Sequence, residues 1–236
     1  MAEISLRDSQ PSDLDGRVIR LFGCGTLGSR VALHLAHWGV PYLVLYDPKV
    51  VQPRNVLGLS SQKYRDEHVG KPKVEMLACM LREINPGILV ETWHRKIEGV
   101  ETLSGIVMDG LDSFEGRVAV RDSCFQSPNV SLHIHGRLGV SHGHVFALDP
   151  RNLYHQDRFS HPDLWKPFGP PGPEEIACGA TQSNMIIAEL AAVAMVHRLW
   201  AWLAREKGSE VSIPNDETIV IEPVIVTDSV EWVPSD

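Results

Sequence analysis

A short glycine-rich segment begins the part of this chain that could do chemistry. Gly23-Cys24-Gly25-Thr26-Leu27-Gly28 directly follows an apolar run at residues 18–22. Glycines at a strand-to-helix turn let phosphate oxygens approach backbone N–H groups and the amino end of the helix. The segment therefore predicts a bound nucleotide without saying which one. The predicted contacts are Gly23, Gly25, Thr26, Leu27 and Gly28.

Polar residues after the glycine segment favour ATP over NAD. Asp47 ends the next apolar run, where an acid can accept hydrogen bonds from ribose hydroxyls of either nucleotide. Lys73 begins a predicted helix, and Asn55 lies between the two. A lysine there has no evident use in dinucleotide binding, but it could offset the negative charge of a triphosphate. Taken singly, Lys73 is better explained as a solvated residue at a helix start.

Asp112 follows a predicted strand at 105–108 and should lie at the carboxyl edge of a parallel sheet. A carboxylate there could hold Mg²⁺, or it could simply cap the next helix. Arg117, five residues later, could contact a nucleotide or lie on a solvated helix face. The occurrence of all these residues at such offsets is explained most economically by one shared site.

Composition excludes several functional classes. The chain has 236 residues, 22 basic and 30 acidic side chains and a net charge of −8, which argues against a nucleic-acid partner. The four cysteines form no C-x-x-C pair, so we expect neither a disulfide framework nor a structural zinc. The amino terminus has no apolar core of the signal-peptide type. These features predict a cytoplasmic protein.

The alternation of short apolar runs with amphipathic stretches predicts an α/β fold of the Rossmann-like type. We expect a doubly wound, mainly parallel sheet with antiparallel strands near the C-terminus and one long buried helix. Predicted strands are residues 18–22, 42–46, 88–93, 105–108, 130–134, 218–222 and 224–226. Predicted helices are residues 27–38, 73–84, about 114–125 and 183–205.

We expect a single domain, 1–236, in three parts. Residues 16–148 form the nucleotide-binding core, 149–182 a proline-rich crossover loop, and 183–236 a helix with closing strands. The prolines of the loop argue against a regular helix there. The helix at 183–205 approaches the length of a membrane span, but charged residues interrupt it, so a buried core helix and no membrane partner are expected.

Four histidines invite a metal hypothesis. His133, His135, His142 and His144 could ligate a transition metal, but alternation within two strands joined by a loop explains them as well. We favour the second interpretation.

Taken in order, these motifs resemble those of the ThiF/MoeB adenylyltransferases, the bacterial relatives of ubiquitin-activating enzymes. The resemblance covers about residues 16–148 and continues more weakly through 178–203. The matching segments are Gly23–Gly28, Asp47 with Asn55, Gly70-Lys71-Pro72-Lys73-Val74-Glu75, Glu83-Ile84-Asn85-Pro86, and Asp109-Gly110-Leu111-Asp112 with Arg117.

The resemblance implies an activity and a set of roles. The carboxyl end of a small ubiquitin-like or sulfur-carrier protein ending in glycine would attack the α-phosphate of Mg·ATP, giving an acyl-adenylate and pyrophosphate. Asp47 would hold the ribose, Asn55 and Lys73 the phosphates, and Asp112 the Mg²⁺ or the reacting centre. Leu111 and Arg117 would complete the ATP site. A homodimer and a conjugating enzyme as a further partner are also implied.

The sequence departs from the family pattern at two places. The family usually has Asp-x-Asp where this chain has Asp47-Pro48-Lys49, and Asn-Leu-x-Arg-Gln where this chain has Asn55-Val56-Leu57-Gly58-Leu59. The arginine that would neutralise triphosphate charge is therefore absent. Arg54 as a catalytic residue, Arg7, or an arginine of a partner subunit could replace it. The alternative is a degenerate member that binds nucleotide without activating a carrier.

Cys178 is the cysteine best placed to be a nucleophile. It precedes the long apolar helix, where related enzymes often carry a cysteine that takes the acyl group as a thioester, and a helix amino end would favour the thiolate. A small buried residue at a helix start is an equally good interpretation. Other functions left open are adenylation of a small carboxylate or modified RNA, an NAD(P)-binding oxidoreductase, and a non-catalytic scaffold.

Overall fold

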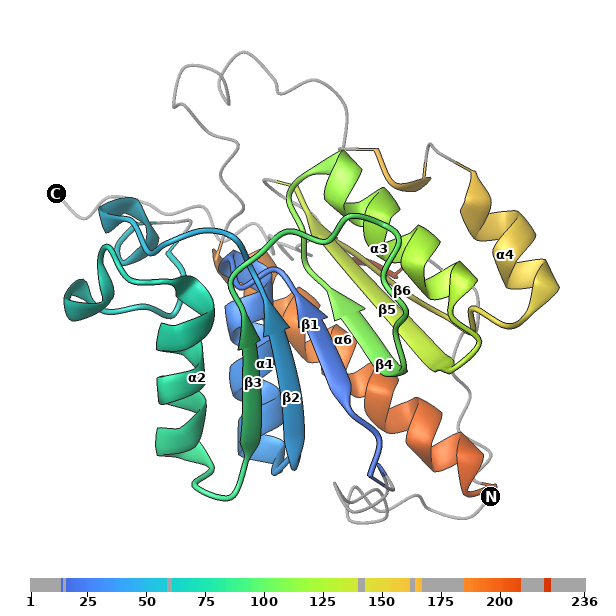
Figure 1. Cartoon of the computed structure of the whole chain (residues 1–236), viewed down its shortest axis with the longest axis horizontal. Coiled ribbons are helices and arrows are strands. Elements are labelled where there is room, and N and C mark those ends of the chain that lie inside the picture. Colours follow the sequence, from blue (N-terminus) through green and yellow to red (C-terminus); the bar gives the residue numbers. More distant parts are fainter. Residues whose placement is uncertain are drawn as a thin grey trace, which may run out of the picture.

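A seven-stranded sheet organises the structure, in the order β3-β2-β1-β4-β5-β6-β7 (Figure 1). The computed structural model describes Leu14 and residues 16–58, 61–139, 143–161, 164–166 and 185–208, together with the backbone of Ile219–Ile221. Neighbouring strands from β3 to β5 pair in parallel, and the last two are antiparallel. The strands are β1 (Ile19–Phe22), β2 (Tyr42–Tyr46), β3 (Leu89–Trp93), β4 (Gly105–Asp109), β5 (Val130–Leu138), β6 (Gly143–Leu148) and β7 (Ile219–Ile221).

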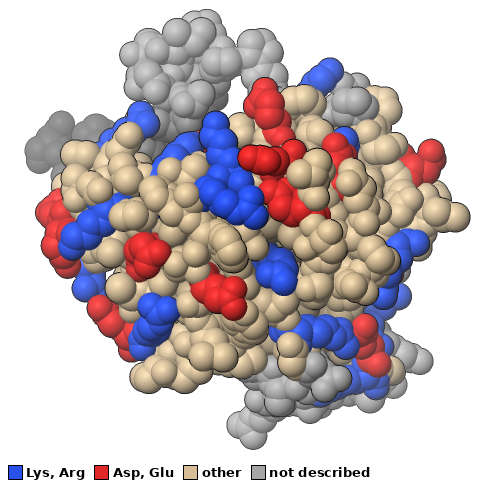
Figure 2. Space-filling view, viewed as in Figure 1, with Lys and Arg blue, Asp and Glu red and all other residues tan. Residues whose placement is uncertain are grey.

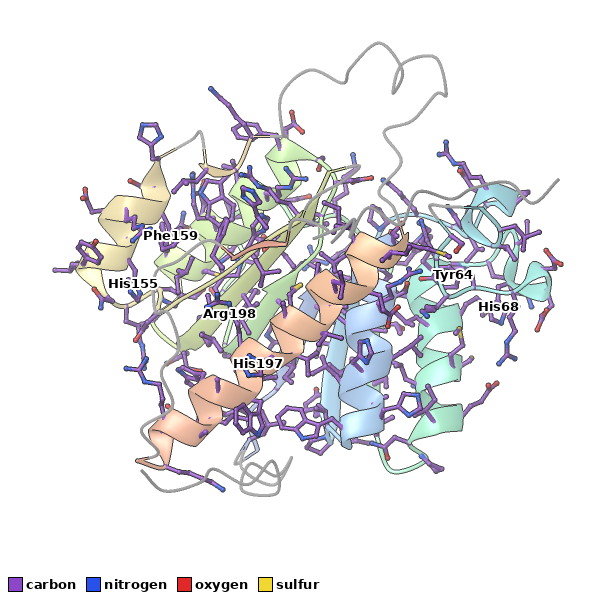
Figure 3. The ribbon with its side chains drawn as sticks, turned by 180° about the vertical axis from the view of Figure 1, so that it is seen from behind. Tyr64, His68, His155, Phe159, His197 and Arg198 are labelled. Carbon is purple, nitrogen blue, oxygen red and sulfur yellow. The ribbon has the colours of Figure 1, made fainter. Side chains whose placement is uncertain are left out.

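Helices cover both faces of the sheet (Figure 1). One face carries α1 (Thr26–Trp38), α2 (Lys73–Ile84) and α6 (Met185–Glu206), which share one large apolar core with the sheet. The other face carries α3 (Phe114–Gln126) and α4 (Leu153–Ser160). Figure 3, seen from behind, shows α6 running diagonally across the sheet beside α1.

Close packing places α6 directly on the sheet and on α1. A Cβ added to Gly136 of β5 would lie 2.5 Å from Met195 Sδ and 2.7 Å from Leu27 Cδ2, so only glycine leaves room for the helices. The inner face of α6 is fully buried at Ala191, Met195 and Leu199. By length and composition alone α6 could also cross a membrane, and half of its most apolar window is buried within the protein.

The strand order reverses beside β1, and this sets where a site can form. β2 and β4 lie on either side of β1, and all three run in the same direction. Their carboxyl ends therefore meet at one edge of the sheet, the place where open α/β folds bind ligands. The glycine segment leaves β1 at this edge.

The structure confirms the predicted fold class and most of the elements, with boundaries shifted by a few residues. One part of the loop prediction is wrong: residues 153–160 form α4 within the segment expected to be a proline-rich loop. Asn152 caps this helix, because its Oδ1 accepts hydrogen bonds from the N–H groups of Tyr154 (2.9 Å) and His155 (3.4 Å). The predicted strand at 224–226 lies outside the described residues.

Candidate nucleotide-binding site

The glycine segment makes a tight turn between β1 and α1. Gly23 has a φ of +89°, and a Cβ added to Gly28 would lie 1.8 Å from Gly23 O. These two glycines are therefore required by the turn itself. A Cβ added to Gly25 would meet nothing within 4 Å, so this side of the turn is open. The structure thus separates glycines that shape the backbone from one that leaves space beside it.

The amino end of α1 has no side-chain cap among the residues that the structure describes. Gly25 is its N-cap residue, no side chain caps it, and its first turn contains no acidic residue. Thr26 and Leu27 begin the helix, so the predicted contacts lie in its first turn. Backbone N–H groups and the helix dipole favour negative charge at such an end.

Asp47, just beyond the end of β2, is buried and ties the glycine segment to the chain that follows it. Its Oδ2 accepts a hydrogen bond from the Cys24 N–H (2.7 Å), and its Oδ1 accepts one from the Lys49 N–H (2.7 Å). An ionised carboxylate has about four acceptor positions, so each oxygen can accept a further bond. Asp47 therefore has a structural role and can also accept from a ribose hydroxyl.

Lys73 is a buried ammonium at the amino end of α2. The residue is 4% exposed, and its side-chain nitrogen makes no hydrogen bond or ion pair with any residue that the structure describes. Burial lowers its pKa, and the nearby Lys49 adds to this effect, against the attraction of Asp47. A buried charge without a partner is costly unless a ligand compensates it.

Tyr64 fixes Lys73 relative to the glycine segment. Its buried hydroxyl donates to Cys24 O (2.7 Å) and also lies 3.4 Å from Lys73 O. Figure 3 shows Tyr64 near the amino end of α2. Sequence reasoning did not find Tyr64, because its partners are 40 and 9 residues away and no local pattern marks them.

Asn55 and Arg54 lie on a short 3₁₀ turn, Pro53–Asn55, and differ in exposure. Asn55 is buried, and its Oδ1 accepts a hydrogen bond from the Gln52 N–H (2.8 Å). Its side-chain NH₂ makes no hydrogen bond with a described residue, which leaves it able to donate to a ligand. Arg54 is exposed. Its suggested replacement of the missing arginine stays a prediction.

Asp112 lies beyond the end of β4 and forms an ion pair with Lys49, which lies beyond the end of β2. Asp112 Oδ2 is 2.8 Å from Lys49 Nζ, and the two side chains are 79% and 58% exposed. Since β2 and β4 flank β1, this pair spans the carboxyl end of β1, from which the glycine segment leaves. Figure 2 shows basic and acidic atoms side by side near this upper edge of the molecule.

Arg117 supports the loop that carries Asp112. It is buried and donates hydrogen bonds to the carbonyl oxygens of Leu111 (2.8 Å), Trp165 (3.1 Å) and Asp112 (3.4 Å). Leu111 in turn lies against the glycine turn, 3.1 Å from the position of a Cβ on Gly23. These three bonds hold the guanidinium to the main chain, and direct contact of Arg117 with a nucleotide stays a prediction.

A buried charged cluster lies at the end of β4, three residues before Asp112. Asp109, the last residue of β4, accepts hydrogen bonds from His133 Nε2 and His135 Nδ1 of β5, both at 2.8 Å, and all three side chains are fully buried. Trp165 stacks on His133. Sequence reasoning explained the histidines by alternation within strands, but its strand ended at residue 134, before His135. It missed their partner Asp109, because that contact depends on the register of β4 with β5.

The two histidines hold their protons differently. Burial would lower the pKa of His133, but neighbouring Cys124 and Asp109 outweigh it and raise the pKa to about 10. For His135 burial prevails over Asp109, and its pKa is lowered. Burial would raise the pKa of Asp109, yet His135 and His133 hold it well below its usual range. At neutral pH the cluster therefore contains one anion, one cation and one neutral imidazole.

In the described part of the chain, the Asp109–His133–His135 cluster included, no group of three or more His, Cys, Asp or Glu side chains could hold a metal ion. His144 Nδ1 instead lies 3.1 Å from an Arg137 nitrogen. His142 and Cys178 lie outside the described residues, so the expected lack of zinc stays a prediction.

Comparison with known proteins identifies the family. Residues 6–215 match the ThiF family. The chain belongs to the ThiF family. Among curated relatives of this ThiF-family chain, the SAMP-activating enzyme E1 of Haloferax volcanii is 31% identical over 142 residues, which are 58% of this chain and 51% of that protein. The adenylyltransferase and sulfurtransferase MOCS3-1 of Zea mays is 34% identical over 134 residues, which are 52% of this chain and 28% of that protein.

Solved structures show the same fold. Escherichia coli MccB, in a crystal structure with ATP, matches this ThiF-family chain with a TM-score of 0.65 and 16% identity, over 83% of this chain and 58% of that one. At this identity the likeness shows the fold alone. This chain thus spans about half, or less, of the length of the curated relatives given above.

Because of the Asp109–His133–His135 cluster, we expect the free energy of unfolding to fall as pH rises from 7 to 10. A raised pKa means that the contribution of His133 to stability is complete below its unfolded value of about 6.5 and is lost as pH rises through about 10. Substituting His133→Gln should therefore flatten the fall in free energy of unfolding between pH 7 and 10. It should also lower that free energy at pH 7 by about 3–5 kcal/mol, because Asp109 is left as a buried, unpaired charge.

Urea unfolding at several pH values measures both effects. His135→Gln is the matched control, since its lowered pKa keeps His135 neutral throughout this range and its substitution should leave the slope unchanged. An unchanged slope in His133→Gln would show that another group titrates.

Proposed function

We propose that this ThiF-family chain is an ATP-dependent adenylyltransferase that activates the C-terminal carboxylate of a small ubiquitin-like or sulfur-carrier protein. The single observation that carries the proposal is the buried Lys73 ammonium, which makes no bond with a described residue and lies at the sheet edge used by ligands. A protein that only folded around this lysine would gain nothing from burying its charge. A triphosphate would compensate it.

The residues around Lys73 fit ATP in position and charge. The open side of Gly25 and the uncapped amino end of α1 suit phosphate oxygens. Asp47 can accept from the ribose, and the side-chain NH₂ of Asn55 can donate to a phosphate. MccB, which shares the fold, has been crystallised with ATP. The curated relatives are named as activating enzymes and adenylyltransferases.

The proposed reaction is a displacement at phosphorus. A carboxylate oxygen of the carrier attacks the α-phosphorus, the bond from that phosphorus to the bridging oxygen breaks, and pyrophosphate leaves with the electron pair. The product is a mixed anhydride of the carrier and AMP. Lys73 and the amino end of α1 offset the negative charge on the phosphates, and Asp47 fixes the nucleoside.

A divalent cation fits one position in this site. Asp112 is an exposed carboxylate that follows β4 at the ligand-binding edge, and Mg²⁺ is commonly held by one or two carboxylates together with substrate phosphates. Bound there, Mg²⁺ would neutralise charge on the phosphates. Arg117 donates to the carbonyl oxygens of Leu111 and Asp112, so the loop that would present this side chain is tied to α3.

A scaffold that binds nucleotide without catalysis is the second candidate function. Gly58 stands where the family arginine was expected, and its φ of +97° is a conformation that arginine rarely adopts. The loss of the arginine is therefore built into the local backbone. ATP binding without pyrophosphate exchange would favour this second function.

Replacing Lys73 tests the first function. Lys73→Met should reduce ATP–pyrophosphate exchange at least about 100-fold, because it removes a charge placed at the phosphates. The same variant should raise the free energy of unfolding by about 1 kcal/mol or more, because a buried ammonium is replaced by an apolar side chain. Exchange is measured with candidate carriers, and stability by urea unfolding.

Lys71→Met is the matched control, since Lys71 is an exposed lysine two residues earlier. It should change neither quantity appreciably. Loss of stability together with loss of exchange in Lys73→Met would instead indicate a structural role for Lys73.

A thioester on Cys178 would be a second step of this proposal. The thiolate would attack the carbonyl carbon of the acyl-adenylate and release AMP. Cys178 lies outside the described residues, so the step rests on its place in the sequence. Cys178→Ser should abolish a carrier adduct that reducing agent cleaves, while leaving pyrophosphate exchange intact. Full carrier transfer by this variant, followed on non-reducing gels, would rule the thioester out.

We also propose that the chain forms a homodimer through the outer face of α6. Ile186, Leu190 and Val193 are 59%, 45% and 51% exposed and lie on one face of the helix at spacings of four and three residues. Charge introduced there by Leu190→Asp should convert a dimer to a monomer, measured by light scattering. A monomeric wild-type protein at micromolar concentration would contradict the proposal.

A further inference from the structure

Lys49 is an exposed cation that contacts three residues of the proposed site. Its ammonium is 2.8 Å from Asp112 Oδ2. Its main-chain N–H donates to Asp47 Oδ1 (2.7 Å), and its carbonyl oxygen accepts a hydrogen bond from the Lys73 N–H (3.0 Å). Lys49 thus contacts the three residues assigned to the ribose (Asp47), the phosphates (Lys73, through its main chain) and the metal (Asp112).

The position of Lys49 follows from the strand order. Lys49 comes three residues after β2 ends and Asp112 three residues after β4 ends, and β1 lies between these strands. The glycine segment continues from β1, and Gly23 N–H donates to Tyr46 O (2.8 Å) at the end of β2. The Lys49–Asp112 pair therefore crosses the start of the segment that would receive the phosphates.

The Lys49–Asp112 ion pair is weak, so Lys49 can exchange Asp112 for another partner. An ion pair between exposed side chains stabilises a fold little, because water screens it and both long side chains lose freedom. The two ammonium groups of Lys49 and Lys73 also repel each other, and Lys49 helps to lower the pKa of Lys73 after the larger effect of burial. A polyphosphate at this edge would relieve the repulsion and offer Lys49 a more highly charged partner than one carboxylate.

We propose that Lys49 replaces the missing arginine as the second cation of the triphosphate site, and that it leaves Asp112 when ATP binds. The proposal rests on the adenylyltransferase function proposed above. Lys49 then contacts β- or γ-phosphate oxygens, and the Asp112 carboxylate becomes available to a divalent cation. Since the same ammonium pairs with Asp112 in this structure, its move to the phosphates would make the nucleotide and metal sites available together.

Among the replacements considered for the missing arginine, Arg54 is the one that the structure describes. Its side chain is exposed on the 3₁₀ turn, and no hydrogen bond or ion pair connects it with Asp47, Lys73 or Asp112 among the described contacts. Lys49, by contrast, is held through its backbone to both Asp47 and Lys73. A cation on a fixed backbone loses less freedom when it binds an anion.

Titration calorimetry with ATP plus Mg²⁺, and separately with AMP, tests the proposal on the full chain. Lys49→Met should weaken ATP binding about tenfold, the effect of losing one charge-assisted hydrogen bond, and should leave AMP binding unchanged because AMP lacks the outer phosphates. Lys49→Arg should restore most of the ATP affinity. Lys71→Met, at an exposed lysine outside the site, should bind both nucleotides as the wild type does.

Each other outcome has a definite meaning. Equal ATP binding by Lys49→Met and the wild type, or equal loss of ATP and AMP binding, would overturn the assignment to Lys49. A tenfold loss in Arg54→Met with none in Lys49→Met would transfer the role to Arg54. Absence of ATP binding by the wild type itself would overturn the proposed function instead, so the two failures are distinguishable.

Discussion

The Asp47 carboxylate is the constraint on which the site depends. Its two oxygens accept hydrogen bonds from the main-chain N–H groups of Cys24 and Lys49. The carbonyl oxygen of Lys49 in turn accepts a hydrogen bond from the main-chain N–H of Lys73. These bonds connect the glycine segment, the chain after β2 and the start of α2 in one continuous series. Without the carboxylate, the buried Cys24 N–H would lose its partner, which is costly in a protein interior. The residue assigned to the ribose is thus also the residue that holds the site in shape.

The Asp112 side of the site has a different construction. Its main chain accepts hydrogen bonds from the buried Arg117, and the Asp109–His133–His135 cluster lies at the end of β4, three residues earlier. The Asp112 side chain itself is exposed and paired only with another exposed group. A rigid backbone with a side chain that can exchange partners suits a residue that must bind and release a ligand. The charges of the Asp109–His133–His135 cluster, by contrast, are fully buried and paired with one another.

Local patterns in the sequence predicted the fold, and contacts across strands limited the prediction of the site. The spacing of apolar residues and the positions of turn residues located β1, α1, β2 and α2. Asp47 and Lys73 follow these elements at offsets that placed both residues at one edge of the sheet. The α4 helix was missed because proline density was judged over a whole segment, although 153–160 contains no proline. The Asp109 cluster and the Lys49–Asp112 pair depend on which strands are neighbours and in what register, which a single sequence does not specify.

The placement of charge explains how a family member could lose its arginine. At Gly58 the left-handed backbone, with a φ of +97°, disfavours any larger side chain, so the charge cannot return there without a change in the loop. Position 49 lies next to a backbone fixed by Asp47 and Lys73, where the family usually has an acid. A lysine there removes one negative charge and adds one positive charge close to the phosphates. Because the ammonium groups of Lys49 and Lys73 repel each other, a second lysine here requires a counterion. Asp112 provides that counterion.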